Sequence, residues 1–184
     1  LAQRTGRYIS YAQPLLDGSL PDGSRVNASY TKDVTSNGPT FTIRKFTKTP
    51  WTPTQLIAFN TVSPEMLAYF WILMQYKSNI LISGGTGSGK TTFLNALAFF
   101  IPPEARVVSI EDTREINLPR ENWLPAVARP SIGIGKVGEV DLFALLKSSF
   151  RQMPDYLIVG EVRGKEAFVL FQGMASGHPS LSTM

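Results

Sequence analysis

The sequence contains no cysteine and a single histidine, His178. Disulfide bonds and thiolate metal sites are therefore excluded, and one imidazole cannot build a histidine metal cluster. Long hydrophobic runs are also missing. The longest apolar run, MLAYFWILMQY at 66–76, is shorter than the ~20 residues that a membrane-spanning helix needs, and the first residues lack the apolar core of a signal peptide. These absences favour a soluble, cytoplasmic chain.

The remaining composition is that of globular protein, with 43% hydrophobic and 17% charged residues among 184. This length suffices for one medium domain or two small ones. Charge is unevenly distributed: residues 1–50 hold seven Lys or Arg and three Asp, whereas residues 51–184 hold eleven charges of each sign. The formal net charge of +4 thus comes from the first part, which indicates a modular boundary.

The first part is rich in turn residues, and short alternating runs at 25–30 and 40–46 predict strands. We therefore expect a β-rich N-terminal domain over residues 1–49, only part of which is present. Pro50 and Pro53 in TKTPWTP mark a linker, and residues 50–62 are expected to hold this linker and a first short helix. Residues 63–184 form the expected second domain.

The second part alternates helical and strand patterns. A helix is predicted over 64–77, with Ser63 as its N-cap and Pro64 at its first position, and its nearly all-round apolarity predicts burial. Strands are then predicted at 79–83, 105–111 and 156–161, and helices at 90–101, 139–153 and 165–175. Such alternation is typical of an α/β fold with a parallel sheet and right-handed crossovers.

A phosphate-binding loop lies between the first of these strands and its helix. Gly84, four residues, Gly89, Lys90 and Thr91 match G-x-x-x-x-G-K-[ST]. Glycines let the backbone N–H groups approach a phosphate, the lysine neutralises phosphate charge, and the Thr91 hydroxyl is placed for Mg²⁺. The predicted nucleotide-binding residues are Gly84, Gly85, Thr86, Gly87, Ser88, Gly89, Lys90, Thr91 and Thr92.

A Mg²⁺–nucleotide site also needs acidic residues at the carboxyl edge of neighbouring strands. Glu161 ends one predicted strand and is the expected second metal ligand beside Thr91. The segment IEDTRE ends another strand and brings Glu111, Asp112 and Glu115 to the same edge. One of these, or Glu161, could orient the attacking water. Asp155 lies six residues before Glu161, roughly 20 Å away along a strand, and is expected to be structural.

Several ordered motifs resemble the secretion ATPase superfamily, which drives type II and type IV secretion, type IV pili and the archaellum. They are GGTGSGKTTFLNAL, SIEDTREINLPRENW, FRQMPDYLIVGEVRGKEAFVLFQGMASGHPS and, earlier, DGSRVNA with FTIRKF. ENW, VGEVRGKEA and GMASGH are similar to the archaeal type II/IV secretion and archaellum ATPases in particular. The resemblance covers nearly the whole chain and implies a RecA-like P-loop core.

The resemblance also implies a hexameric, Mg²⁺-dependent ATPase whose N-terminal and RecA-like domains move against each other during turnover. The phosphate loop is then Walker A, and YLIVGE is an atypical Walker B strand ending in Glu161. IEDTRE is the aspartate box, in which Glu111 and Glu115 are both candidates for positioning the attacking water. His178 is the first histidine of the histidine box.

Arginines are natural partners for the charge that develops during phosphoryl transfer, because the guanidinium fork binds phosphate oxygens in pairs. The resemblance implies that some come from the N-terminal domain. Arg25 and Arg44 are therefore the first candidates, in the same or the neighbouring subunit, followed by Arg163 and Arg114.

The implied partners are further subunits of a homohexamer and a polytopic membrane platform protein, with the motor at the cytoplasmic face of the membrane, in peripheral contact with it. No nucleic acid is expected. Met153 stands where close relatives place a basic residue, and the chain stops before the second histidine of the histidine box. We therefore expect a fragment of a longer chain with weak ATPase activity.

Two other functions remain open at this point. The chain could be a nucleotide-binding structural or regulatory module with little catalysis, or another P-loop ATPase such as a DNA translocase or helicase. DNA-stimulated turnover would distinguish the latter. GTPases are disfavoured, because the sequence contains no N-K-x-D-like guanine motif.

Overall fold

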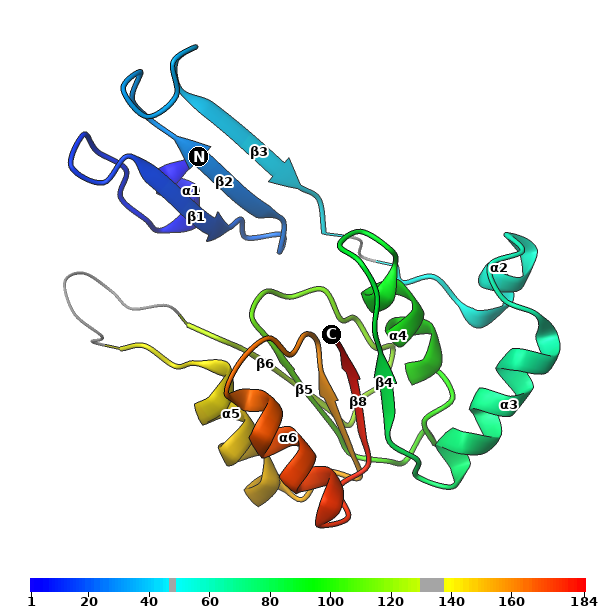
Figure 1. Ribbon diagram of the computed structural model, residues 1–184. Helices are drawn as coiled ribbons and strands as arrows, with labels where there is room; N and C mark the ends of the chain where they lie inside the picture. Colours follow the sequence, from blue (N-terminus) through cyan, green and yellow to red (C-terminus); the bar gives the residue numbers. More distant parts are fainter. Residues whose placement is uncertain (47–48, 130–137) are drawn as a thin grey trace. The chain divides into compact units, whose positions relative to one another are not determined.

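The computed structural model describes residues 1–46, 49–129 and 138–184. The chain divides into two compact units, Leu1–Lys48 and Thr49–Met184, each of which is described by itself (Figure 1). The first two residues of the predicted linker TKTPWTP, 47 and 48, lie outside the described residues. Among the residues that are described, no helix is long and apolar enough to cross a membrane.

The first unit is a short helix and a three-stranded antiparallel sheet. Helix α1 spans Ala2–Thr5, and strands β1 (Leu15–Ser19), β2 (Arg25–Ser29) and β3 (Thr40–Arg44) pair in the order β1-β2-β3. β2 and β3 confirm the alternating runs read from the sequence. The core is small, consisting of Leu16, Val26 and Ala28.

The second unit contains a parallel sheet, as predicted, and this sheet has five strands. Its strands are β4 (Ile80–Ile82), β5 (Val107–Glu111), β6 (Trp123–Val127), β7 (Tyr156–Val159) and β8 (Ser180–Thr183). They pair in the order β4-β8-β7-β5-β6. The last strand in sequence therefore lies between the first and the fourth, and all five strands direct their carboxyl ends to one edge.

Six helical segments accompany this sheet: α2 (Pro53–Ala58), α3 (Pro64–Gln75), α4 (Lys90–Ala98), α5 (Leu142–Ser149), the 3-10 turn η1 (Phe150–Gln152) and α6 (Glu166–Ala175). Local sequence explains where several begin. Ser63 caps α3 by accepting a hydrogen bond from the Met66 N–H, as predicted, and Asp141 caps α5 through the Ala144 N–H. The predicted helix 139–153 is thus shorter and ends in a 3-10 turn.

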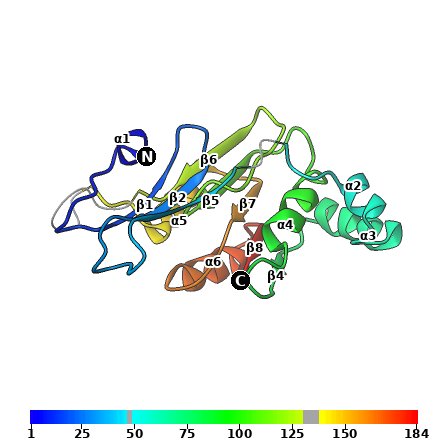
Figure 2. The ribbon, with the colours of Figure 1, turned by 90° about the horizontal axis from the view of Figure 1, so that it is seen from above.

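The two faces of the parallel sheet have separate cores, because successive strand residues point to opposite faces. On β7, Tyr156 and Ile158 pack with α2, α3 and α4, whereas Leu157 and Val159 pack with α5 and α6. Figure 2 shows α4 and α6 on different sides of β8. This is a sheet sandwiched between helices, as the predicted α/β class requires.

The expected burial of α3 is wrong. Of its residues only Leu67 and Met74 are buried, whereas five large side chains remain exposed: Met66, Tyr69, Trp71, Ile72 and, at the C-cap, Tyr76. The helix covers the core with one stripe, and its other apolar side chains face outward from the Thr49–Met184 unit. Apolar content alone therefore overestimated its burial.

Candidate functional site

The phosphate loop connects the end of β4 to the start of α4, as predicted. Gly87 and Gly89 have φ angles of 74° and 90°, in the left-handed region that glycine adopts without strain. Gly89 is the N-cap of α4, so the free backbone N–H groups of the first helical turn face the loop. A β-carbon at Gly84 would lie 2.9 Å from the Ser88 Oγ, so a larger residue there would require the Ser88 side chain to move.

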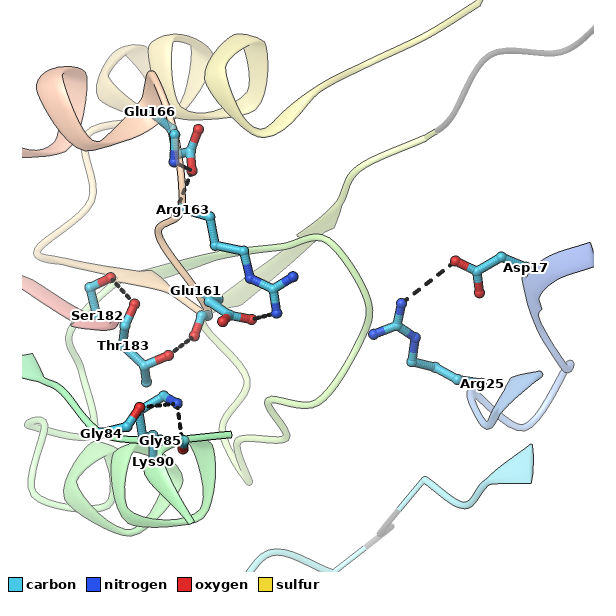
Figure 3. Close-up of polar contacts among 12 residues, drawn as sticks. Asp17, Arg25, Gly84, Gly85, Lys90, Glu161, Arg163, Glu166, Ser182 and Thr183 are labelled. Carbon is cyan, nitrogen blue, oxygen red and sulfur yellow. Dashed lines mark hydrogen bonds and ion pairs between the residues drawn. The ribbon is translucent and has the colours of Figure 1, made fainter. Parts of the chain in front are cut away.

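Lys90 is the first residue of α4 and folds back over this loop. Its Nζ donates hydrogen bonds to the carbonyl oxygens of Gly84, at 2.8 Å, and Gly85, at 3.0 Å (Figure 3). The loop therefore holds the ammonium group where phosphate oxygens would arrive. The helix N-terminus adds partial positive charge at the same place.

In the sheet, strand β8 lies between β4, which leads into this loop, and β7, which leads into the segment with Glu161. Thr183 lies opposite Ile82 of β4, and on its other side its hydroxyl donates to the Gly160 carbonyl at 2.6 Å. The Val162 N–H donates to the Thr183 carbonyl at 2.9 Å. Since β8 separates β4 from β7, the ends of these two strands, which lead into the phosphate loop and Glu161, lie roughly 10 Å apart at the same edge.

Glu161 pairs with Arg163, whose Nη2 donates to the Glu161 carboxylate (Figure 3). The hydrogen bond to Glu161 raises the pKa of the Arg163 guanidinium above its usual value. The turn that follows is fixed by Glu166, whose Oε1 accepts from the N–H groups of Arg163 and Gly164, both at 2.7 Å. Burial acts to raise the pKa of Glu166, but these backbone donors leave it below the usual value.

The two candidate glutamates of the IEDTRE segment have different environments. Glu111, the last residue of β5, is 2% exposed, whereas Glu115 is half-buried. Glu111 Oε1 accepts hydrogen bonds from the N–H groups of Glu115 and Ile116, both at 2.7 Å. Its Oε2 is buried without a hydrogen-bond partner among the described residues. Burial raises the pKa of Glu111 to about 7, against the opposing effect of the two backbone donors.

Asn95 of α4 holds the backbone of the segment around Glu115 by two hydrogen bonds. This residue of α4 is 7% exposed; its Nδ2 donates to the Glu115 carbonyl at 3.2 Å, and its Oδ1 accepts from the Asn117 N–H at 3.1 Å. Since α4 begins at the phosphate loop, Asn95 links the backbone of Glu115 to the helix that carries Lys90. Sequence reasoning missed this residue, because an asparagine inside a helix has no motif signature.

The remaining predicted residues lie elsewhere. His178 precedes β8, at the amino edge of the sheet, where its ring contacts Phe150 and Ser176. The length of β8 separates it from the phosphate loop of the same chain. Arg25 and Arg44 belong to the Leu1–Lys48 unit, where Arg25 forms an ion pair with Asp17 at 3.8 Å.

Asp155 has the structural role expected of it. It lies at the amino end of β7, where its Oδ2 accepts the Arg106 N–H at 2.9 Å and its Oδ1 lies 3.5 Å from Lys77 Nζ. Met153, the residue that departs from the motif, is 83% exposed and has a φ of 50° after the 3-10 turn.

The oxygen donors at the carboxyl edge fit Mg²⁺. Thr91 offers a hydroxyl in the first turn of α4, and Glu161 offers a carboxylate. Within the described ranges, no group of three or more His, Cys, Asp or Glu residues is arranged to hold a metal ion. Mg²⁺ keeps several waters and is usually bound through one or two protein oxygens together with substrate phosphates, so this sparse donor set suits it.

A cavity of about 640 Å³ borders the phosphate loop on the side of α2 and Trp51. Aromatic side chains form part of its wall, although no sequence motif assigns them to the site. Two of them, Trp51 and Phe59, flank the short helix α2 in the segment that was expected to hold the linker and a first short helix.

Similarity to known proteins identifies the family of this chain. Residues 8–184 match the family model described as Type II/IV secretion system protein. The chain belongs to this family. It is 49% identical to the uncharacterised protein MJ0900 of Methanocaldococcus jannaschii over 100% of the chain and 33% of that protein. It is 33% identical to the type IV secretion system protein PtlH of Bordetella pertussis over 97% of the chain and 60% of that protein.

Two solved structures share the fold. The VirB11 ATPase from the type IV secretion system of Brucella suis, in complex with sulphate, has a TM-score of 0.57 at 26% identity, with 99% of this chain and 59% of that chain covered. The pilus retraction motor PilT with bound ADP has a TM-score of 0.62 at 19% identity, with 92% and 46% covered. The chain spans between 25% and 60% of the length of its curated relatives from M. jannaschii and B. pertussis.

Proposed function

We propose that this chain is the nucleotide-binding part of a Mg²⁺-dependent ATPase motor. The observation that carries the proposal is the position of Lys90, whose ammonium group is held by two carbonyls of a glycine-rich loop at the start of a helix. The same sheet edge carries Glu161 and Glu115. Membership of the secretion family supports ATP as the fuel, and the VirB11 relative is described as an ATPase.

Lys90 would exchange its two carbonyl partners for phosphate oxygens when a nucleotide binds. Phosphate oxygens carry full charge, and charge-assisted hydrogen bonds are about twice as strong as neutral ones. The exposed loop carbonyls of Gly84 and Gly85 then return to water at little cost. Thr91 and Glu161 would hold Mg²⁺, which supplies positive charge to the phosphate oxygens when bound.

Glu115 is the residue to which we assign the positioning of the attacking water. Glu111 is almost fully buried, and its Oε1 already accepts two backbone hydrogen bonds. A water-positioning carboxylate must reach solvent that enters with the nucleotide, and only Glu115 of the two is partly exposed. Glu111 then acts on the reaction through the backbone of Glu115.

The arginines divide between the two units. Arg163 lies beside Glu161 and is well exposed, so it can move from this carboxylate to a phosphate oxygen. Arg25 and Arg44 would contribute from the N-terminal unit of the same or a neighbouring subunit, with Arg114 of the IEDTRE segment as a further candidate. Arginines from a neighbouring subunit would make each site complete only in an oligomer, and the family supports a homohexamer as that oligomer.

The family supports a proposal for the machine that the motor drives. We assign the motor to a secretion, type IV pilus-like or archaellum machine at the cytoplasmic face of a membrane. Its partner there would be a polytopic membrane platform protein, with peripheral contact to the membrane and no nucleic acid. A second candidate function, a nucleotide-binding module with little catalysis, is favoured by one contact: the pairing of Glu161 with Arg163 occupies the carboxylate that would hold the metal.

ATP turnover measured against protein concentration tests these functions, with light scattering to follow assembly. The motor predicts turnover per subunit that rises with assembly and is lost in Lys90→Ala and Glu115→Gln. The module predicts tight MgATP binding and no turnover at any concentration. Turnover that persists in both variants would contradict the assigned site. Turnover stimulated by DNA would identify a translocase instead.

A further inference from the structure

The cavity beside the phosphate loop has two chemically different walls. One wall is the loop and the start of its helix, with Gly89, Lys90 and Thr92, and the other is apolar, with Trp51, Leu56 and Phe59. Every lining residue belongs to the Thr49–Met184 unit. The volume of about 640 Å³ is within the range of roughly 300–1,000 Å³ that is typical of small-molecule sites.

The apolar wall is held in place by short-range structure. Thr52 caps α2 in a capping box: its side chain accepts from the Gln55 N–H, and its own N–H donates to the Gln55 side chain at 2.9 Å. Pro53 begins the helix, and Leu56 anchors it in the core at 4% exposure. Although α2 has six residues, its position relative to the sheet is therefore defined.

Two aromatic rings flank this helix and contact each other. The ring centroids of Trp51 and Phe59 lie 5.1 Å apart with an interplanar angle of 83°, an edge-to-face pair. The two side chains nevertheless remain 43% and 58% exposed. Their contact orients the rings without burying them, so aromatic surface stays available to a ligand in the cavity.

The phosphate loop fixes which part of a nucleotide can reach this wall. Lys90 and the loop N–H groups attract the phosphates, and the remainder of the ligand must extend away from them. Thr92 and Phe93 follow Lys90 in the first turns of α4 and line the same cavity. The aromatic wall thus begins beside the residues that contact the phosphates, in one continuous cavity.

We propose that the wall formed by Trp51, Phe59 and Phe93 binds the purine base of the nucleotide whose phosphates lie on the loop. This proposal rests on the proposed function, and it assigns the base-recognising residues, which the sequence leaves unidentified. Stacking on aromatic rings is the main source of base affinity where hydrogen-bond readout is scarce.

The lining also predicts which base is preferred. Among the described residues that line the cavity, Lys90 is the one charged side chain, and no carboxylate or side-chain amide contributes. Guanine would bring its N1–H and N2 amino donors to a wall without a carboxylate to accept them, and unpaired donors cost affinity. We expect purines to bind more tightly than pyrimidines, and ATP more tightly than GTP by a few-fold.

Fluorescence of Trp51 reports on the base without depending on turnover. The chain has three tryptophans, so Trp71→Phe combined with Trp123→Phe leaves Trp51 as the single reporter. In this background MgATP should change the fluorescence of Trp51, whereas inorganic tripolyphosphate, which offers phosphates without a base, should bind with little change. Equal responses to the two probes would overturn the base assignment.

Affinity measurements on the otherwise unaltered chain provide the second test. Phe59→Ala should weaken ATP binding about tenfold and leave tripolyphosphate binding unchanged. Phe59→Leu keeps apolar packing on α2 and should also weaken ATP, so the result does not depend on the folding of one variant. Phe168→Ala is the matched control, since Phe168 is a 74% exposed aromatic residue on α6, and it should change neither affinity.

The outcomes separate this proposal from the proposed function. Unaltered ATP affinity in both Phe59 variants, with tripolyphosphate still bound, would overturn the base site and leave the phosphate site standing. Failure of the unaltered chain to bind either probe would overturn both. Loss of ATP affinity with tripolyphosphate affinity retained would support both.

Discussion

The buried carboxyl group of Glu111 accepts a hydrogen bond from the backbone N–H of Glu115, at 2.7 Å. The two glutamates are four residues apart in one motif, and from the sequence both are candidates for positioning the attacking water. The structure distinguishes their roles, because the carboxyl group of Glu111 fixes the backbone of Glu115. One glutamate is thereby bound inside the protein, and the other is presented at the sheet edge.

The first prediction separates the roles of these two residues. Glu115→Gln should reduce the turnover number about hundredfold or more, the usual range for loss of a catalytic acid or base, and leave ATP affinity nearly unchanged. Glu111→Gln keeps an oxygen acceptor for the two N–H groups and should retain most of the activity. Steady-state kinetics and ATP binding measure both effects, and a more severe loss in Glu111→Gln would reverse the assignment.

The second prediction concerns the dependence of stability on pH. Burial raises the pKa of Glu111 to about 7 in the folded chain, from its usual value of 4.5. Between these two pH values the folded state keeps a proton that the unfolded state loses, so the free energy of unfolding should fall as pH rises, by about 3 kcal/mol in total.

Glu111→Gln should remove this decline, because an amide does not titrate. Urea unfolding at pH 4.5, 6 and 8 measures the free energy of unfolding for both proteins. The variant should be more stable than the unaltered chain at pH 8 and similar to it at pH 4.5. An identical pH dependence in the two proteins would show that Glu111 is ionised in the folded chain without penalty.

The third prediction concerns Asn95. Asn95→Leu removes the donor to the Glu115 carbonyl and the acceptor for the Asn117 N–H, leaving two backbone groups without these partners. We expect a loss of about 2 kcal/mol in stability, in the range for unsatisfied buried groups. If Asn95 also positions Glu115, the turnover number should fall while KM for ATP stays within about twofold.

Asn122→Leu is the control for this change, because Asn122 is exposed. It should alter neither stability nor turnover appreciably. Unchanged turnover in Asn95→Leu, measured at a temperature where the variant is folded, would restrict Asn95 to a structural role.

The phosphate loop and the α/β class were predictable, because a motif and strong periodicity determine them locally. The strand β8 was not predicted. Its Ser180, Ser182 and Thr183 are fully buried, although a strand inside a parallel sheet is normally apolar. The hydroxyls of Ser180 and Ser182 donate to carbonyls of neighbouring residues, whereas that of Thr183 donates to Gly160, a long-range bond that no sequence pattern reveals. β6 was missed for another reason, since Pro125 argues against a strand except at a sheet edge, where β6 lies.

The candidate site was predictable only in part. The identity of the loop residues follows from their spacing, but the difference between Glu111 and Glu115 depends on burial. The aromatic wall at Trp51 and Phe59 depends on the fold placing α2 and the phosphate loop around one cavity. For His178 the sequence motif alone did not predict the position in the fold. The motif suggests that it belongs to the site, but its position before β8 places it at the amino edge of the sheet, away from the phosphate loop of the same chain.

The last prediction tests the phosphate loop with two lysines that differ in position. Lys90→Ala should weaken binding of tripolyphosphate and of MgATP about thirtyfold, equivalent to about 2 kcal/mol for hydrogen bonds to a charged group. The melting temperature should hardly change, because the hydrogen bonds of Lys90 Nζ within the described part of the chain go to exposed loop carbonyls. Lys77→Ala removes the same charge at the amino edge of the sheet, where Lys77 pairs with Asp155, and should leave both affinities unchanged. Equal losses in the two variants would mean that net charge, and not the loop, attracts the phosphates.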